Sequence, residues 1–105
     1  MIATERILET IKSTVRGHIP DAEVSLFGSR ARNTADPDSD YDILVITNKE
    51  LSPKEKIPLK TAIRKDLLKR DIRTDILIQS SKEIRKKKLL PGHIIKNILK
   101  ESILL

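Results

Sequence analysis

Apolar residues recur along the chain with two different periods, and these periods predict alternating helices and strands. Apolar positions three or four apart predict helices over residues 4–18, 52–69, 80–88 and 94–99. Short runs rich in aliphatic and β-branched residues predict strands at 23–27, 41–47 and 72–79. The order helix–strand–strand–helix–strand–helix–helix indicates an α+β (mixed α/β) fold, a small mixed sheet of three to four strands packed with helices.

Two helix starts carry a capping pattern of serine followed three residues later by glutamate: Ser52 with Glu55, and Ser80 with Glu83. Pro53 suits the first helical position after Ser52. Pro58 lies too deep for the first turn of that helix, so we expect the helix to begin nearer Lys56. The tail 102–105 is compatible with more helix or with a short added strand.

Length and composition indicate one domain spanning residues 1–105. The chain has no cysteine, which excludes disulfides and thiolate metal sites and fits a reducing cytoplasm. The longest apolar run, Ile43–Ile46, is far shorter than the roughly 20 residues that cross a bilayer. We therefore expect a soluble, cytoplasmic protein with no membrane partner.

The chain carries a net charge of +6 and has a pI near 9.7. This charge suits a polyanionic ligand such as a nucleotide, a nucleic acid or an acidic protein. A lysine-rich solvated surface explains it equally well. Nucleic acid is not favoured, because Phe27 and Tyr41 are the only aromatic residues on which bases could stack.

Gly28 and Ser29 directly follow the first predicted strand and open a loop of about a dozen residues, and loops of that length in a compact domain are usually functional or disordered. A glycine lets the backbone approach a phosphate closely, and a serine hydroxyl adds a donor. The alternative is an ordinary turn. We expect the loop to include a helical turn over residues 29–32. Arg30 and Arg32 could neutralise phosphate charge or lie in solvent.

Asp40 and Asp42 stand at the entrance to the second predicted strand. Alternate residues of a strand share a face and lie roughly 6 to 7 Å apart. Two such carboxylates suit Mg²⁺, which prefers oxygen ligands. Asp75, at the start of another strand, could add a third carboxylate for a second ion, could act as a general base, or could merely cap a turn.

The combination of Gly28-Ser29, Asp40-x-Asp42 and the later Asp75 resembles the signature of the polymerase-β-like nucleotidyltransferase superfamily. The short chain resembles its minimal nucleotidyltransferase (MNT) family, whose members pair with HEPN-domain proteins. The family usually has glycine where this chain has Asn33.

The resemblance implies a role for each matching residue. Gly28, Ser29 and Arg32 would bind the nucleotide, Asp40 and Asp42 would bind Mg²⁺, and Asp75 would bind a second Mg²⁺ or accept the proton of the attacking hydroxyl. The implied reaction is in-line attack on the α-phosphate of ATP with loss of pyrophosphate. The implied biological role is that of an antitoxin which places AMP on a tyrosine of a HEPN toxin.

Two other function classes fit the sequence. The chain could be a non-catalytic subunit that neutralises its partner by contact alone, or a small basic RNA-binding protein that uses residues 82–88. His18 and His93 have no partner at metal-ligand spacing and are expected to be ordinary residues. The apolar tail 103–105 could support a homo-oligomer or partner binding.

Overall fold

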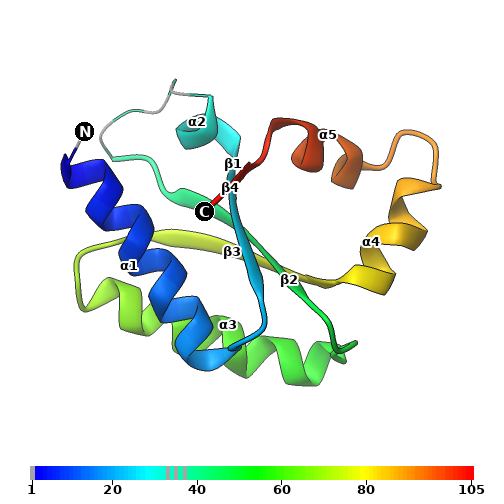
Figure 1. Ribbon diagram of the computed structural model, residues 1–105, viewed down its shortest axis with the longest axis horizontal. Helices are drawn as coiled ribbons and strands as arrows, with labels where there is room; N and C mark the ends of the chain where they lie inside the picture. Colours follow the sequence, from blue (N-terminus) through cyan, green and yellow to red (C-terminus); the bar gives the residue numbers. More distant parts are fainter. Residues whose placement is uncertain (1, 33, 35, 37) are drawn as a thin grey trace.

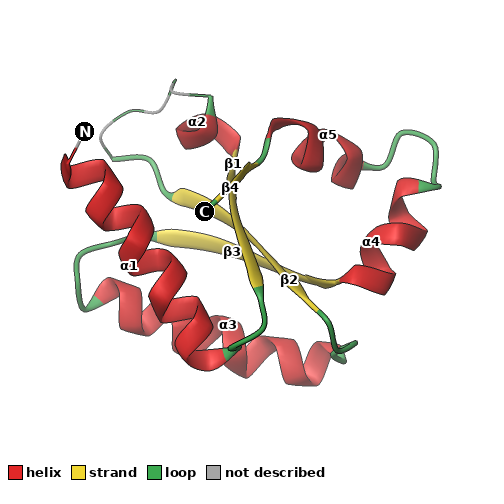
Figure 2. Ribbon diagram, viewed as in Figure 1, coloured by secondary structure: helices red, strands yellow, loops and turns green. Residues whose placement is uncertain are grey.

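The structure, a computed structural model, describes residues 2–32, 34, 36 and 38–105. The elements follow one another along the chain (Figures 1 and 2) as α1 (Ile2–His18), β1 (Glu23–Phe27), α2 (Gly28–Ala31), β2 (Tyr41–Thr47), α3 (Pro53–Leu68), β3 (Thr74–Ser80), α4 (Ser81–Lys88), α5 (Ile94–Glu101) and β4 (Ile103–Leu104). The predicted mixed α/β fold is confirmed. None of the described helices is long and apolar enough to cross a membrane.

Within the described residues, four strands form one mixed sheet in the order β3-β2-β1-β4. β1 is antiparallel to β2 and to β4, whereas β2 and β3 are parallel and are joined through α3. The chain tail, for which the sequence allowed helix or strand, therefore adds the short edge strand β4. In this register Phe27, Asp42 and Asp75 stand in one row across three strands.

Helices cover both faces of the sheet. Alternate residues of the strands point to opposite faces, which gives the sheet two apolar surfaces. One surface packs on α1 and α3 through a large core that includes Val15, Ile43, Val45, Ile63 and Ile78. The other packs on α4 and α5 through a smaller core of Leu44, Ile84, Ile95 and Ile98. Figure 1 shows α4 and α5 on the side of the molecule away from α1 and α3.

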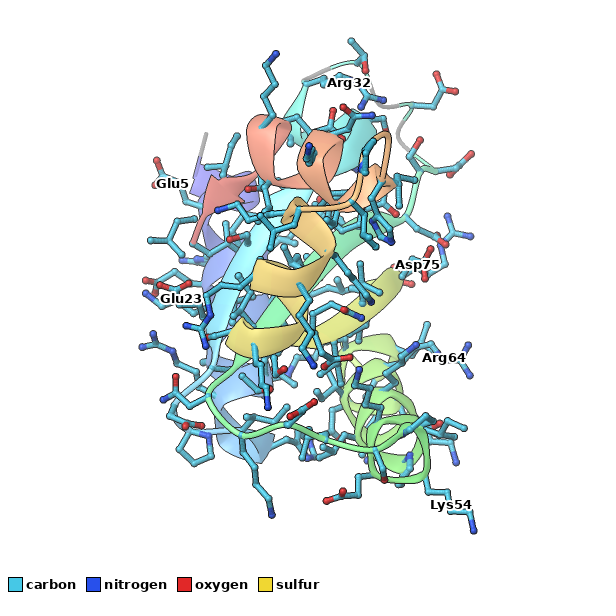
Figure 3. The ribbon with its side chains drawn as sticks, turned by 90° about the vertical axis from the view of Figure 1, so that its right-hand side faces the viewer. Glu5, Glu23, Arg32, Lys54, Arg64 and Asp75 are labelled. Atoms are coloured by element: carbon cyan, nitrogen blue, oxygen red, sulfur yellow. The ribbon has the colours of Figure 1, made fainter. Side chains whose placement is uncertain are left out.

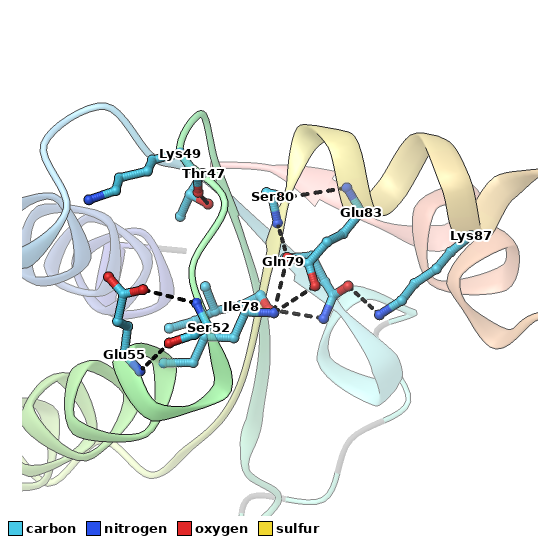
Figure 4. Close-up of polar contacts among 10 residues, drawn as sticks. Thr47, Lys49, Ser52, Glu55, Ile78, Gln79, Ser80, Glu83 and Lys87 are labelled. Carbon is cyan, nitrogen blue, oxygen red and sulfur yellow. Dashed lines mark hydrogen bonds and ion pairs between the residues drawn. The ribbon is translucent and has the colours of Figure 1, made fainter.

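Both capping patterns form the expected hydrogen bonds. The Glu55 N–H donates to Ser52 Oγ, and the Ser52 N–H donates to Glu55 Oε1 at 3.1 Å. Ser80 and Glu83 repeat the arrangement at the start of α4, as Figure 4 shows. Lys56 Nζ also donates to both oxygens of Glu83, at 3.0 and 2.8 Å. The second cap therefore also ties α4 to α3.

The expectation that α3 begins near Lys56 is wrong. The helix begins at Pro53, because the capping box of Ser52 fixes its start and a proline at the first position loses no intrahelical hydrogen bond. Pro58 lies inside the helix and removes one backbone donor there. β3 also begins at Thr74 rather than at residue 72, and α5 continues to Glu101.

Candidate active site

Two of the predicted acidic residues stand side by side where β2 and β3 begin. Asp42 and Asp75 are paired residues of adjacent parallel strands, so they point to the same face with backbones about 4.8 Å apart. Asp42 is half-buried and Asp75 is exposed. In Figure 3, Asp75 points outward at one side of the molecule, and Arg32 lies above it, near α5. The sheet register thus brings together carboxylates from distant parts of the sequence.

Asp40 lies just before the first residue of β2 and faces a cation. Its Oδ1 is 3.9 Å from Arg73 Nε, and Arg73 also donates to the backbone carbonyl of Asp38 at 2.7 Å. The side chains of Asp40 and Arg73 are 54% and 55% exposed, so their attraction is weak. Turning Asp40 toward Asp42 would therefore cost little.

The pKa of Asp42 reports on this acidic cluster. Burial raises the pKa of Asp42, and the neighbouring charges of Asp75 and Asp40 raise it further, while Arg32 opposes the rise. The ionised cluster is therefore unfavourable as it stands, and a bound cation would relieve the repulsion. Among the described residues, no three acidic or histidine side chains are arranged closely enough to hold an ion. A metal site here needs the side chains to draw together.

Gly28 lies directly against the carboxylate of Asp42. Its φ of +73° is a conformation that side-chain-bearing residues rarely adopt. A Cβ atom at this position would lie 2.1 Å from Asp42 Oδ2, too close for any real contact. Only glycine therefore lets the turn from β1 into α2 pass beside the acidic cluster.

Glu101, the last residue of α5, completes the site from the other end of the chain. The Gly28 N–H donates to Glu101 Oε1 at 3.2 Å, and Arg32 donates to Glu101 Oε2 at 2.7 Å. The hydrogen bond from Arg32 holds the pKa of Glu101 below its usual value. The sequence interpretation missed this residue because nothing local marks it and it lies 73 residues beyond Gly28.

Arg30 positions the loop in front of β2. Its guanidinium lies 4.4 Å from the centre of the Tyr41 ring and donates to the Ser39 carbonyl at 2.8 Å. This contact fastens α2 to the residues that lead into Asp40. Ser29 lies within α2, and its carbonyl accepts from the Thr34 N–H at 3.0 Å. Asn33, where the family that the sequence resembles usually has glycine, lies outside the described residues.

Both histidines make structural contacts. His18 Nε2 lies 2.7 Å from Asp66 Oδ2 and joins α1 to α3. This hydrogen bond lowers the pKa of Asp66. His93 Nδ1 accepts from the Ile95 N–H at 3.1 Å and caps α5.

Comparison with known proteins identifies the family of the chain. Residues 5–105 match the protein family described as the nucleotidyltransferase domain. Six solved chains also match. A search of curated protein sequences gave no significant match.

Three of the solved structures are similar over nearly the whole chain. A protein described as a minimal nucleotidyltransferase is 28% identical, with a TM-score of 0.59, over 99% of this chain and 93% of that one. A toxin–antitoxin structure with AMP-PNP is 21% identical, with a TM-score of 0.61, over 91% and 69%. A protein of Sulfolobus solfataricus described as a nucleotidyltransferase is 24% identical, with a TM-score of 0.55, over 98% and 79%. The toxin–antitoxin structure and the Sulfolobus solfataricus protein are only 21% and 24% identical to this chain, so they show the shared fold alone. Because the family match covers residues 5–105, the chain belongs to the nucleotidyltransferase domain family.

Proposed function

We propose that this protein is a Mg²⁺-dependent nucleotidyltransferase that moves AMP from ATP to a hydroxyl group of a protein partner, a HEPN-type toxin, and so acts as its antitoxin. Family membership gives the reaction class, nucleotidyl transfer. The observation that carries the proposal further is the placement of Gly28 against Asp42, with Asp75 beside Asp42 on the neighbouring strand. This arrangement places carboxylate oxygens beside a glycine turn that a phosphate can approach closely, at one end of strands β1, β2 and β3.

Asp40, Asp42 and Asp75 fit Mg²⁺ by the chemistry of their oxygen donors and by the repulsion that raises the pKa of Asp42. Together with the triphosphate, three carboxylates offer enough oxygen ligands for two ions. The bound ions would supply charge neutralisation for the phosphates. Asp40 would leave its weak contact with Arg73 to take part.

The residues of the chain would bind and orient the nucleotide. The Gly28 N–H, the Ser29 hydroxyl and the Arg32 guanidinium are the donors assigned to its phosphates. An acceptor oxygen would then attack the α-phosphorus in line, the bond to the β-phosphate would break, and pyrophosphate would leave. Asp75, if it is not a metal ligand, would take the proton of the acceptor hydroxyl.

A protein acceptor suits the exposure of this site. Asp75 is exposed at the start of β3, so a side chain of a large partner can reach it. One structure of the same fold is a toxin–antitoxin structure with AMP-PNP. The sequence signature resembles that of MNT proteins, which pair with HEPN proteins. These observations support a toxin protein as the acceptor and ATP as the donor.

Label transfer tests the proposal. The purified protein is incubated with Mg²⁺, ATP labelled at the α-phosphate, and the protein encoded beside it. We expect label on the partner with wild type and none with Asp42→Asn or without Mg²⁺. If Asp42→Asn still abolishes the toxicity of the partner fully, neutralisation works by contact alone and the catalytic proposal is wrong.

A further inference from the structure

Two donors assigned to the nucleotide already hold an anion in this structure. The carboxylate of Glu101 accepts from the Gly28 N–H at 3.2 Å with one oxygen and from Arg32 at 2.7 Å with the other. A phosphate group would use the same two donors, because both anions present oxygen acceptors and bind arginine through charge-assisted hydrogen bonds. Glu101 and a phosphate therefore cannot both make these contacts.

We propose that Glu101 is an internal competitor of the triphosphate, and that a nucleotide binds to Gly28 and Arg32 only after the Glu101 carboxylate has moved away. This inference rests on the proposed function, since it takes those two residues as the phosphate donors. It adds a residue of α5 that sets nucleotide affinity. No motif in the sequence marks this residue.

Charge supports competition rather than joint binding. Asp42 already lies near the negative charges of Asp75, Asp40 and Glu101. A triphosphate that entered beside a fixed Glu101 would meet an additional carboxylate at its own binding position. The negative charges of the triphosphate and of Glu101 would repel each other, so the nucleotide binds more tightly when Glu101 is displaced.

The contact is placed so that it can form and break. The Arg32 side chain is 52% exposed and the Glu101 side chain is 30% exposed, so solvent can replace either partner. Ser102 follows Glu101 with extended backbone, and Ile103 pairs with Leu26 of β1. This pairing keeps the end of α5 beside Gly28, so the carboxylate stays at high local concentration. Such a solvent-exposed ion pair favours the closed contact only a few-fold over the open one.

Glu101→Gln tests the competition, with Glu9→Gln as its matched control. Glutamine keeps the size of the side chain and a carbonyl acceptor but loses the charge. The apparent affinity of wild type equals the affinity of the open form multiplied by the fraction of molecules that are open. If about one molecule in five is open, Glu101→Gln should bind inorganic tripolyphosphate and Mg²⁺-ATP about fivefold more tightly than wild type. Glu9→Gln makes the same change of net charge on α1, on the other face of the sheet. It should change affinity little.

Calorimetric titration measures both ligands, and urea unfolding of the free proteins checks that each variant is folded. Unchanged affinity in Glu101→Gln would overturn the proposal. Weaker affinity would also overturn it, because Glu101 would then be a support for Arg32. If Glu101→Gln does not fold, Glu101→Ala serves in its place with the same expectation.

The titrations separate this inference from the proposed function. Mg²⁺-ATP binding by wild type but not by Asp42→Asn, with no gain in Glu101→Gln, would leave the proposed function standing and reject the competition. If neither wild type nor Glu101→Gln binds Mg²⁺-ATP or tripolyphosphate, both proposals are wrong.

Discussion

Replacing Gly28 by alanine would test whether the turn after β1 really lies against the acidic cluster. The new Cβ would lie 2.1 Å from Asp42 Oδ2 and 3.0 Å from its Cγ, so the Asp42 side chain would have to turn away. The backbone at φ +73° would also hold a side-chain-bearing residue in the left-handed region. The two costs are separate, and the chain offers a way to measure each.

Gly92→Ala is the matched control. Gly92 has φ +70°, yet a Cβ atom added there would meet nothing within 4 Å. It should therefore show the backbone cost alone, about 1 kcal/mol. Gly28→Ala should cost about 2 kcal/mol, since displacing the Asp42 carboxylate from its rotamer adds about 1 kcal/mol. A difference of about 1 kcal/mol corresponds to roughly 4 °C or more in Tm for a domain of this size.

Urea unfolding of the two alanine variants, in wild type and in Asp42→Ala, completes the test. In Asp42→Ala the carboxylate is gone and only the Cβ of residue 42, 3.2 Å from the added Cβ, remains. The cost of Gly28→Ala should therefore fall toward that of Gly92→Ala, while the cost of Gly92→Ala should not change. Equal costs for the two alanine variants in wild type would refute the close approach of Gly28 to Asp42. Persistence of the larger cost in Asp42→Ala would refute it as well.

Three further predictions concern the cluster and the helices. The pKa of Asp42 is raised above its ordinary value of 3.8 by burial and by the neighbouring carboxylates, so the stability of the free protein falls as the pH rises from 3.8 to the raised pKa and stays lower above it. Asp42→Asn should therefore stabilise the free protein at pH 7 and change its stability little below pH 4. Urea unfolding over a pH series checks this, and a gain that does not vary with pH would contradict it. Glu83→Gln should lower the free energy of unfolding by about 2 kcal/mol, because it leaves Lys56, whose side chain is 14% exposed, without its ion-pair partner. Adding Lys56→Met should restore part of this stability, whereas a loss below about 0.5 kcal/mol in Glu83→Gln would show that the pair contributes little. Pro58→Ala should raise the midpoint of thermal unfolding and increase the free energy of unfolding by about 1 kcal/mol, because it restores a backbone donor inside α3. A lower midpoint would mean that the proline stabilises the protein by restricting its unfolded state.

Local patterns in the sequence predicted most of the fold. The capping boxes at Ser52 and Ser80 were predictable because each depends on residues three apart. The start of α3 at Pro53 depends on the cap at Ser52, and Pro58 inside the helix does not move it. A strong cap and a proline at the first position outweigh one missing backbone donor further along the helix.

The site was predictable as a set of residue types and less so as a geometry. Asp42 and Asp75 each open an apolar strand, which the sequence shows, but their pairing depends on the register of two parallel strands. The contact of Gly28 with Asp42 likewise depends on the antiparallel register of β1 and β2. Glu101 could not be found at all, because only the packing of α5 brings it to Gly28.

The central claim is that the cluster at the start of β2 and β3 binds a nucleotide with Mg²⁺, and thermal unfolding tests it most directly. Wild type and Asp40→Asn/Asp42→Asn are compared with and without Mg²⁺ and ATP. We predict that Mg²⁺ and ATP together stabilise wild type, by about 2.7 kcal/mol at 100 times the dissociation constant, and leave the double variant unchanged. No stabilisation of wild type by any nucleotide, or equal stabilisation of the double variant, would contradict the account.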